Sequence, residues 1–262
     1  MVEQQVRFDD GAAYERMMGV WSRLAGDIFL DWLKLPSGLK VVDVGCGNGA
    51  FTELLVERCA PVEVQGIDPS PAQVAFARTR HTAKVAEFRQ GDAMALPFAD
   101  KLFDVATMAL VIFFVPDPAK GVAEMVRVVR PGGTVAAYAW DMLGGGFPME
   151  PIFSEIRALG HKVSGPPCPE ASRMESLRAL WTTAGLEAVE TRRITVQRTF
   201  VDIDDFWMTG TLTGSIHPTA AALSSDDVQL AKSRLRARLP ADATGRIAYT
   251  AFANAVKGRV PQ

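Results

Sequence analysis

The sequence predicts an α/β protein built on a doubly wound, largely parallel sheet, and three observations carry this prediction. Short apolar runs typical of buried strands recur roughly every 20–30 residues between residues 40 and 140. Helical stretches separate them, and the first run passes directly into a glycine-rich turn. Strands that alternate with helices in this way form parallel sheets whose crossover connections cover both faces.

The first elements follow from apolar spacing. Residues 12–33 are expected to form an amphipathic helix, because apolar side chains recur at steps of three and four, and Pro36–Gly38 ends it. The first three strands are expected at Lys40–Val44, Val62–Ile67 and Ala86–Gln90.

Two helices are expected between these strands. Residues 50–59 have a helical pattern. A second helix begins at Ser70, followed by Pro71 and Gln73. A serine N-cap, a proline at the first helical position and a glutamine two residues later form a start signal, because the polar side chains satisfy backbone N–H groups.

The fourth and fifth strands are expected at Phe103–Ala109 and Thr134–Trp140. Asp117 and Pro118 begin the helix between them, and Pro131–Gly133 ends it. After Asp141 the pattern is less regular. We expect helices near 149–159 and over 172–184, followed by a long strand over 186–200. A basic helix is expected from Ser224 or Ser225 to about 238. Residues 201–222 are ambiguous, and residues 246–256 form either a strand or a helix.

Composition excludes several classes of protein. The 262 residues are 48% hydrophobic and 22% charged, which is typical of a folded globular chain. The formal net charge of −2 lacks the basic character of nucleic-acid binding. We expect no membrane span, no secretory signal, no disulfide framework from the three cysteines and no metal site.

The most informative stretch is Val41–Ala50, V-V-D-V-G-C-G-N-G-A. A strand-to-helix turn with Gly45, Gly47 and Gly49 lets a ligand approach the backbone closely. The stretch also fits the dinucleotide fingerprint G-x-G-x-x-G/A, with Ala50 in the last position. A plain tight turn is a third interpretation.

Three aspartates favour one ligand over the others. Asp43 precedes the first glycine and suits an amino group, whereas it would repel a pyrophosphate. Asp68 ends the second strand, where a carboxylate accepts both hydroxyls of a ribose. Asp92 follows the third strand and can accept from an adenine amine. The ligand implied is an amino-acid nucleoside.

This set of motifs resembles the class I S-adenosylmethionine-dependent methyltransferases, most closely the small-molecule branch of ubiquinone and menaquinone biosynthesis. The resemblance covers roughly Tyr14 to Asp141 and implies a Rossmann-like sheet of seven strands, the last antiparallel. Residues 186–200 and 246–256 are the candidates for the final two strands.

The resemblance also implies which residues bind S-adenosyl-L-methionine and its product S-adenosyl-L-homocysteine. The glycine turn would hold the methionine end, Asp68 the ribose, and Pro69 and the Asp92 motif the adenine. The implied positions are Gly45, Cys46, Gly47, Gly49, Asp68, Pro69, Asp92, Ala93, Met94 and Ala109.

The N-terminal stretch Tyr14–Arg23 resembles a lid that folds over the cofactor in this branch, which implies contacts from Tyr14 and Trp21. Core packing of an amphipathic helix explains these two aromatic residues equally well. We expect one domain over 1–262: a lid helix (1–38), a cofactor-binding core (39–141), a substrate cap with sheet completion (142–222), and a final helix and strand (223–262).

Methyl transfer requires alignment and desolvation, so a catalytic side chain is not obligatory. The candidates for a base are His217, Tyr138 and Asp141. Leu110–Phe114, after the fourth strand, is expected to give the pocket an apolar mouth and so favours an apolar or aromatic acceptor.

Two alternative functions remain open from the residues alone. One is an NAD(P)-dependent oxidoreductase, and the other is a non-catalytic protein that binds S-adenosylmethionine. We expect a cytoplasmic monomer or homodimer that acts on a small-molecule acceptor, without nucleic acid and without an integral membrane segment.

Overall fold

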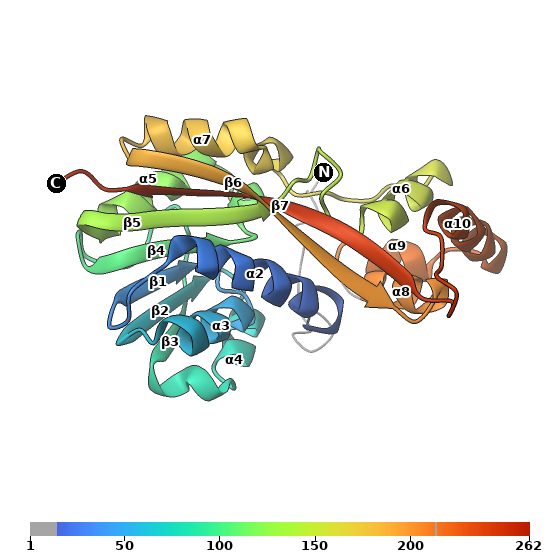
Figure 1. The fold of residues 1–262 in the computed structure, drawn as a ribbon, viewed down its shortest axis with the longest axis horizontal. Coiled ribbons are helices and arrows are strands. Elements are labelled where there is room, and N and C mark those ends of the chain that lie inside the picture. The colour runs from blue at the N-terminus through green and yellow to red at the C-terminus, as the bar shows by residue number, and fades with distance from the viewer. Residues whose placement is uncertain (1–14, 213) are drawn as a thin grey trace.

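A computed structural model describes residues 15–212 and 214–262, and it is organised around one seven-stranded sheet (Figure 1). The strand order is β3-β2-β1-β4-β5-β7-β6, and β7 runs antiparallel to both of its neighbours. The strands are β1 Lys40–Val44, β2 Glu63–Asp68, β3 Ala86–Gln90, β4 Phe103–Ala109, β5 Val129–Trp140, β6 Glu187–Phe200 and β7 Ile247–Arg259. The expected fold class is confirmed.

Helices cover both faces of the sheet (Figure 1). On one face α2 packs against α3, and on the other α5 packs against α7. The α-helices are α2 Val20–Leu33, α3 Ala50–Cys59, α4 Pro71–Ala77, α5 Pro118–Val128, α6 Glu150–Ala158, α7 Met174–Thr183, α8 Ile203–Gly210, α9 His217–Ala221 and α10 Ser225–Arg238. Shorter turns are η1 Glu15–Gly19, η2 His81–Lys84, η3 Ile112–Phe114 and η4 Pro169–Ser172.

The N-cap side chains act as expected, whereas within the described residues no backbone N–H donates to Gln73 Oε1 beside the Ser70 cap. The hydroxyl of Ser70 accepts from Gln73 N–H at 3.4 Å, and the carboxylate of Asp117 accepts from Lys120 N–H at 3.1 Å. Ser224 is the N-cap of α10 and accepts from Asp227 N–H at 3.1 Å. Each bond satisfies one backbone donor that the helix itself leaves without an acceptor.

Several segments differ from the sequence-based expectation or were left open by it: the stretch 246–256, strand or helix, belongs to β7 from Ile247 onward, and the second strand begins and ends one residue later than expected. The helix expected to stop at Pro131–Gly133 ends at Val128, and β5 begins at Val129. Val129 pairs with Phe103, and the register shifts before Val105 pairs with Thr134, so the Pro-Gly-Gly stretch forms an irregularity within the strand. The ambiguous residues 201–222 form α8 and α9.

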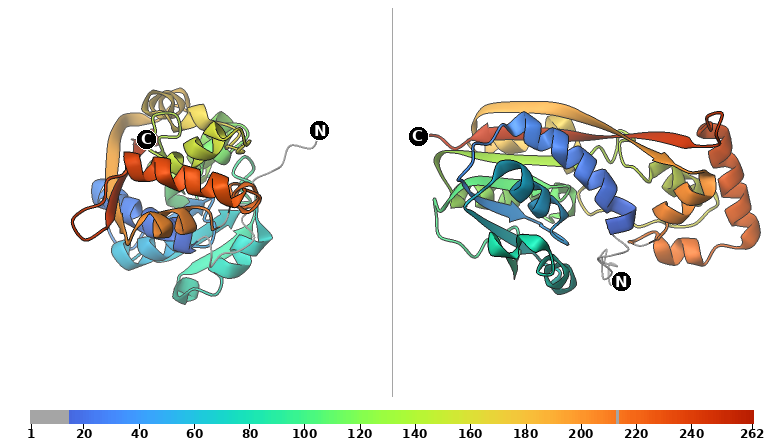
Figure 2. Two further views of the ribbon diagram at one scale, coloured as in Figure 1. Left: turned by 90° about the vertical axis from the view of Figure 1, so that its right-hand side faces the viewer. Right: turned by 60° about the horizontal axis from the view of Figure 1, so that its bottom comes forward.

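The last two strands extend beyond the rest of the sheet. β6 and β7 pair from Glu187↔Arg259 to Phe200↔Ile247, whereas β5 pairs with β7 only as far as Trp140↔Ala253. The remaining residues form a two-stranded ribbon that reaches about 20 Å further, at about 3.4 Å per residue. Helices α8, α9 and α10 gather with α6 at the far end of this ribbon and form the cap region (Figures 1 and 2).

Ion pairs hold the cap region together. Glu155 of α6 accepts from Arg238 of α10 at 2.8 Å, and Asp204 of α8 pairs with Lys232 of α10 at 2.7 Å. The basic residues of α10 therefore bind neighbouring helices as well as facing water. Within the described residues no helix combines the length and the apolar character needed to cross a membrane.

Candidate functional site

The glycine turn between β1 and α3 has the left-handed backbone that its sequence implies. Gly45, Gly47 and Gly49 have φ values of +76°, +52° and +80°. A Cβ at Gly45 would lie 2.5 Å from Val111, so only glycine fits there. At Gly47 no atom of the described residues lies within 4 Å of that Cβ position, which leaves the backbone open to a ligand.

Asp68, at the end of β2, lies directly against this turn. Its Oδ2 accepts from Gly47 N–H at 2.9 Å, and its Oδ1 accepts from Ser70 N–H at 2.9 Å. A carboxylate has about four acceptor positions, so each oxygen can accept one further hydrogen bond. Burial raises the pKa of Asp68, and the two backbone donors oppose that rise.

The end of β3 adds a second carboxylate at the same edge. Asp68 pairs with Gln90 across the two strands, and the Gln90 amide donates to the Pro69 carbonyl at 3.1 Å. Asp92 is exposed, and Met94 N–H donates to its Oδ1 at 2.8 Å. The carboxyl ends of β1, β2 and β3 thus bring the expected motif residues together, with Ala93 and Met94 half-buried beside Asp92.

Asp43 does not face a ligand, contrary to the sequence-based expectation. Its side chain is fully buried, accepts from the Thr52 hydroxyl at 2.6 Å and lies 3.4 Å from the Thr107 hydroxyl. Burial raises the pKa of Asp43 to about 6 despite these two hydroxyls. Cys46 is also buried, and burial raises the pKa of its thiol, so this residue offers its backbone rather than its side chain.

The structure describes only one of the two aromatic residues that were expected to contact the cofactor from the N-terminal stretch. Tyr14 lies outside the described residues. Trp21 is fully buried, and its ring centroid lies 6.5 Å from that of Trp140 and 6.2 Å from those of Phe200 and Tyr249. The structure therefore favours core packing for the Trp21 side chain over a contact with a ligand.

A neighbouring residue, Glu15, connects the N-terminal helix to the glycine turn. Its Oε2 accepts from the Asn48 amide at 2.9 Å and from Arg80 at 2.7 Å. Arg80 also donates to the Asn48 carbonyl at 2.7 Å and to Glu53 at 2.6 Å. Sequence reasoning missed this network because Glu15 and Arg80 are 65 positions apart and match no motif.

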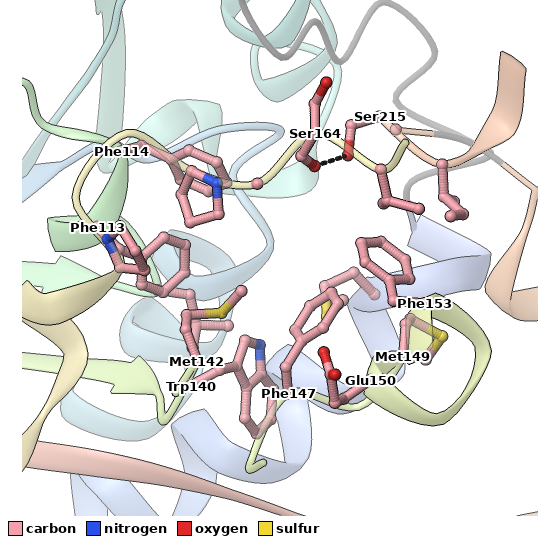
Figure 3. A pocket seen from close by; sticks show the side chains of 18 of the residues that line it. Phe113, Phe114, Trp140, Met142, Phe147, Met149, Glu150, Phe153, Ser164 and Ser215 are labelled. Atoms are coloured by element: carbon pink, nitrogen blue, oxygen red, sulfur yellow. Dashed lines mark hydrogen bonds between the residues drawn. The ribbon is translucent and has the colours of Figure 1, made fainter. Parts of the chain in front are cut away.

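A cavity of about 440 Å³ lies beyond the end of β4 (Figure 3). Most of its wall is apolar, with four methionines and five aromatic side chains: Met17, Met18, Met142, Met149, Phe113, Phe114, Trp140, Phe147 and Phe153. Leu110, directly after Ala109, also lines it. The expected apolar mouth is confirmed for Leu110, Phe113 and Phe114, whereas Val111 packs over Gly45 and Ile112 is fully buried.

None of the three candidate bases lines this cavity. Tyr138 is fully buried, with its hydroxyl 3.4 Å from the Ser22 carbonyl and its ring 4.7 Å from that of Phe29. Asp141 accepts from Gly144 N–H at 2.8 Å. His217 is exposed, and its Nδ1 lies 2.9 Å from the Thr211 carbonyl. No group of three or more potential metal ligands occurs within the described residues.

Comparison with known proteins finds relatives for the segment that contains the glycine turn. Residues 42–137 match a family described as methyltransferase domain. A 2-phytyl-1,4-naphtoquinone methyltransferase of Thermosynechococcus vestitus is 38% identical over 120 residues, which cover 45% of this chain and 51% of that protein. A demethylmenaquinone methyltransferase of Renibacterium salmoninarum is 31% identical over 166 residues, covering 61% of this chain and 65% of that one. The matches thus span about half to two thirds of these relatives.

The fold as a whole also has solved counterparts. A phosphoethanolamine N-methyltransferase 2 of Haemonchus contortus, solved in complex with S-adenosyl-L-methionine, superposes with a TM-score of 0.59. It is 18% identical, and the match covers 97% of this chain and 58% of that one. The strand order and this superposition confirm the expected Rossmann-like fold, and residues 42–137 match the methyltransferase domain family.

Proposed function

We propose that this chain, whose residues 42–137 match a methyltransferase domain family, is an enzyme that transfers a methyl group from S-adenosyl-L-methionine to a small apolar or aromatic acceptor. The relatives named above act on naphthoquinone and menaquinone precursors according to their names, which agrees with the apolar cavity. The cavity-lining part of residues 142–222 is proposed as the acceptor cap.

One observation carries the cofactor assignment: open glycine backbone and two carboxylates share one edge of the sheet. Gly47 leaves room for the methionine end, and Asp68 keeps acceptor capacity on both oxygens for two ribose hydroxyls. Asp92 is exposed two residues beyond β3, where it can accept from an amine. The chain therefore fits an amino-acid nucleoside, bound by Gly45, Cys46, Gly47, Gly49, Asp68, Pro69, Asp92, Ala93, Met94 and Ala109.

The charge of this edge disfavours the oxidoreductase alternative. Asp68 suits the ribose of either cofactor, whereas Asp92 is exposed at this edge and Asp43 lies behind the turn where a dinucleotide would carry its pyrophosphate, so these two acidic residues argue against a dinucleotide. A sulfonium cofactor is cationic, so these carboxylates attract it.

The chain's own contribution is to enclose and align the acceptor. The cofactor supplies an electrophilic methyl group. Leu110 directly follows Ala109, and Met17 lies two residues after Glu15, so both cavity walls continue from residues at the cofactor edge. Apolar walls exclude water and hold the acceptor beside that edge, which is the main requirement of a direct displacement.

Several finer properties belong to the same proposal. We propose a cytoplasmic protein, monomeric or homodimeric, that acts on a small molecule and not on nucleic acid. The near-neutral net charge of −2 supports the last point, because nucleic-acid binding relies on a basic surface.

Ligand-dependent melting tests the cofactor assignment. S-adenosyl-L-homocysteine at 100 times its Kd contributes about 2.7 kcal/mol, which raises the melting temperature by roughly 5 °C or more in a chain of this size. Asp68→Ala should reduce the rise to below about 1 °C, because the ribose loses its acceptor. Asp100→Ala, an exposed aspartate that pairs with Arg127, is the matched control and should retain the full rise.

Two outcomes would contradict the assignment: no rise with the wild type at millimolar S-adenosyl-L-homocysteine, or a rise with NADH instead. Release of S-adenosyl-L-homocysteine during incubation with S-adenosyl-L-methionine and a library of phenols then separates an enzyme from a protein that only binds the cofactor.

A further inference from the structure

The apolar cavity contains one unusual polar corner, formed by Trp140 and Glu150. Trp140 ends β5, and Glu150 begins α6. Both side chains line the cavity, and Figure 3 shows the indole nitrogen and the carboxylate turned toward the same open space. The proposed methyl transfer does not use either group, so the corner requires its own explanation.

Trp140 supplies a hydrogen-bond donor without a partner. The residue is 1% exposed, and its Nε1 has no acceptor among the described residues. Leaving an N–H group unpaired inside a protein is unfavourable, and buried indoles normally find an acceptor. Trp181, by contrast, donates its Nε1 proton to the Val135 carbonyl at 2.9 Å. Trp21 Nε1 also lacks an acceptor among the described residues, but Trp21 does not line the cavity, whereas Trp140 does. A ligand in the cavity can therefore provide the acceptor that Trp140 lacks.

Glu150 supplies the complementary acceptor. Its side chain is 30% exposed and forms an ion pair with Arg157, which also lines the cavity. A carboxylate in an ion pair accepts hydrogen bonds but donates none. Besides the paired guanidinium of Arg157, the corner therefore offers the N–H of Trp140 as a donor and the carboxylate of Glu150 as an acceptor, inside a wall that is mainly apolar.

We propose that Trp140 and Glu150 bind a hydroxyl group of the acceptor molecule and so select hydroxylated apolar rings. The proposal rests on the function proposed above and names its substrate chemistry. A hydroxyl oxygen accepts from Trp140 Nε1 while its proton is donated to Glu150. An acceptor molecule with a keto oxygen in this place would form a hydrogen bond with the indole N–H but none with Glu150. An acceptor molecule with a carboxylate would be repelled by the charge of Glu150. Both residues act by positioning the ring.

A pair of probes that differ by one hydroxyl tests this assignment. Equilibrium dialysis of the wild-type chain, without cofactor, compares 1-naphthol with naphthalene. Hydrogen bonds to both groups should make 1-naphthol bind about tenfold tighter, equivalent to about 1.4 kcal/mol. Trp140→Phe removes the donor and keeps an aromatic ring, and Glu150→Gln removes the charge and keeps the shape. Each should lower the preference at least fivefold and leave naphthalene affinity within twofold of wild type.

Trp181→Phe is the matched control, because it makes the same chemical change in a buried tryptophan outside the cavity wall. This variant should keep the wild-type preference. Equal binding of the two probes by the wild type, a preference that survives both cavity variants, or failure of both probes to bind overturns the proposal. Because S-adenosyl-L-homocysteine is absent, these results are independent of the cofactor assignment, which the melting experiment tests separately.

Discussion

At the scale of single residues, two aspartates at neighbouring strands have opposite environments. Asp68 faces the glycine turn and keeps free acceptor capacity, whereas Asp43 is enclosed and bound by the hydroxyl of Thr52. Both residues lie within a few positions of a strand end, so their spacing in the sequence does not distinguish them. The difference arises because β1 is central and buried on both faces, while Asp68 ends a strand beside an open turn.

The burial of Asp43 predicts a specific pH dependence of stability. Its pKa rises from 3.8 to about 6 in the folded chain, so the folded state holds this proton more tightly than the unfolded state. The resulting stabilisation is complete below about pH 4 and is lost as the pH rises through 6. At about 1.4 kcal/mol for each pKa unit, the loss is about 3 kcal/mol.

Asp43→Asn removes this titration while preserving side-chain shape. Urea unfolding at pH 4.5 and at pH 7 should show the variant gaining stability relative to wild type by roughly 2 kcal/mol between the two conditions. Comparison of the two proteins cancels the titration of the other carboxylates. Parallel pH profiles for variant and wild type would show that Asp43 is ionised throughout this range.

The residue-level predictions were accurate where backbone conformation decided the outcome. Gly45, Gly47 and Gly49 have the positive φ values that their motif implies, because only glycine adopts them without strain. Side-chain environments were less predictable. Trp21 and Tyr138 are core residues because α2 packs on the sheet, and that packing brings together residues more than 100 positions apart.

At the scale of elements, the N-terminal helix is attached to the glycine turn by charge. Arg80 follows α4 and donates to Glu15 of η1, to Glu53 of α3 and to the Asn48 carbonyl of the turn. Its side chain is only 12% exposed, so these charge-assisted bonds are shielded from water. Arg80 therefore orders the turn and the helix that precedes it at the same time.

Arg80→Ala should weaken cofactor binding without touching the cofactor. Without the hydrogen bonds from Arg80, the glycine turn is less ordered in the free protein. Binding of S-adenosyl-L-homocysteine must then also order the turn, which costs free energy, so its Kd should rise about tenfold. Calorimetric titration measures this change. Arg78→Ala is a matched control, because Arg78 lies on the same segment but donates only to the Phe88 carbonyl in the described contacts. Equal Kd values for the two variants would exclude the proposed link.

Element boundaries were predictable where local signals agreed with packing. The expected ranges of β1, α3, β3 and β4 match the structure to the residue. The start of β5 was wrong, because Val129 pairs with Phe103 and this distant contact ends the helix earlier than Pro131 would. Residues 201–222 were ambiguous because α8 and α9 are short, and short helices depend on tertiary contacts for stability.

At the scale of the whole molecule, the cavity is assembled from segments far apart in the chain. Met17 and Met18 come from η1, Leu110 follows β4, Glu150 begins α6, and Ile216 precedes α9 in the cap region. The ribbon of β6 and β7 extends past the last residue of β5, and α8 and α10 lie at its far end, so the cap region lies beyond the end of β5 (Figure 1). The sequence indicated an apolar mouth, but only this arrangement closes it into a cavity.

Because the same segments serve both sites, we expect the two sites to be energetically coupled. Glu15 bonds to Asn48 of the glycine turn, and Met17 and Met18 beside it line the cavity. Val111 packs over Gly45, next to Leu110 in the opposite wall. A ligand at the glycine turn therefore orders both cavity walls. A second ligand that binds in the cavity then loses less free energy, because the walls no longer have to be ordered.

Saturating S-adenosyl-L-homocysteine should tighten the binding of 1-naphthol by about five- to tenfold, and linkage requires 1-naphthol to tighten the first ligand by the same factor. Titration calorimetry in both orders measures the two factors, whose agreement is an internal check. Arg80→Ala should reduce the coupling, because it removes one of the two bonds of Glu15 near the turn and leaves only the bond to Asn48, while the cavity wall stays intact. Identical affinities with and without the partner ligand would mean that the walls are already ordered in the free protein, so that the N-terminal helix contributes to stability but not to communication between the sites.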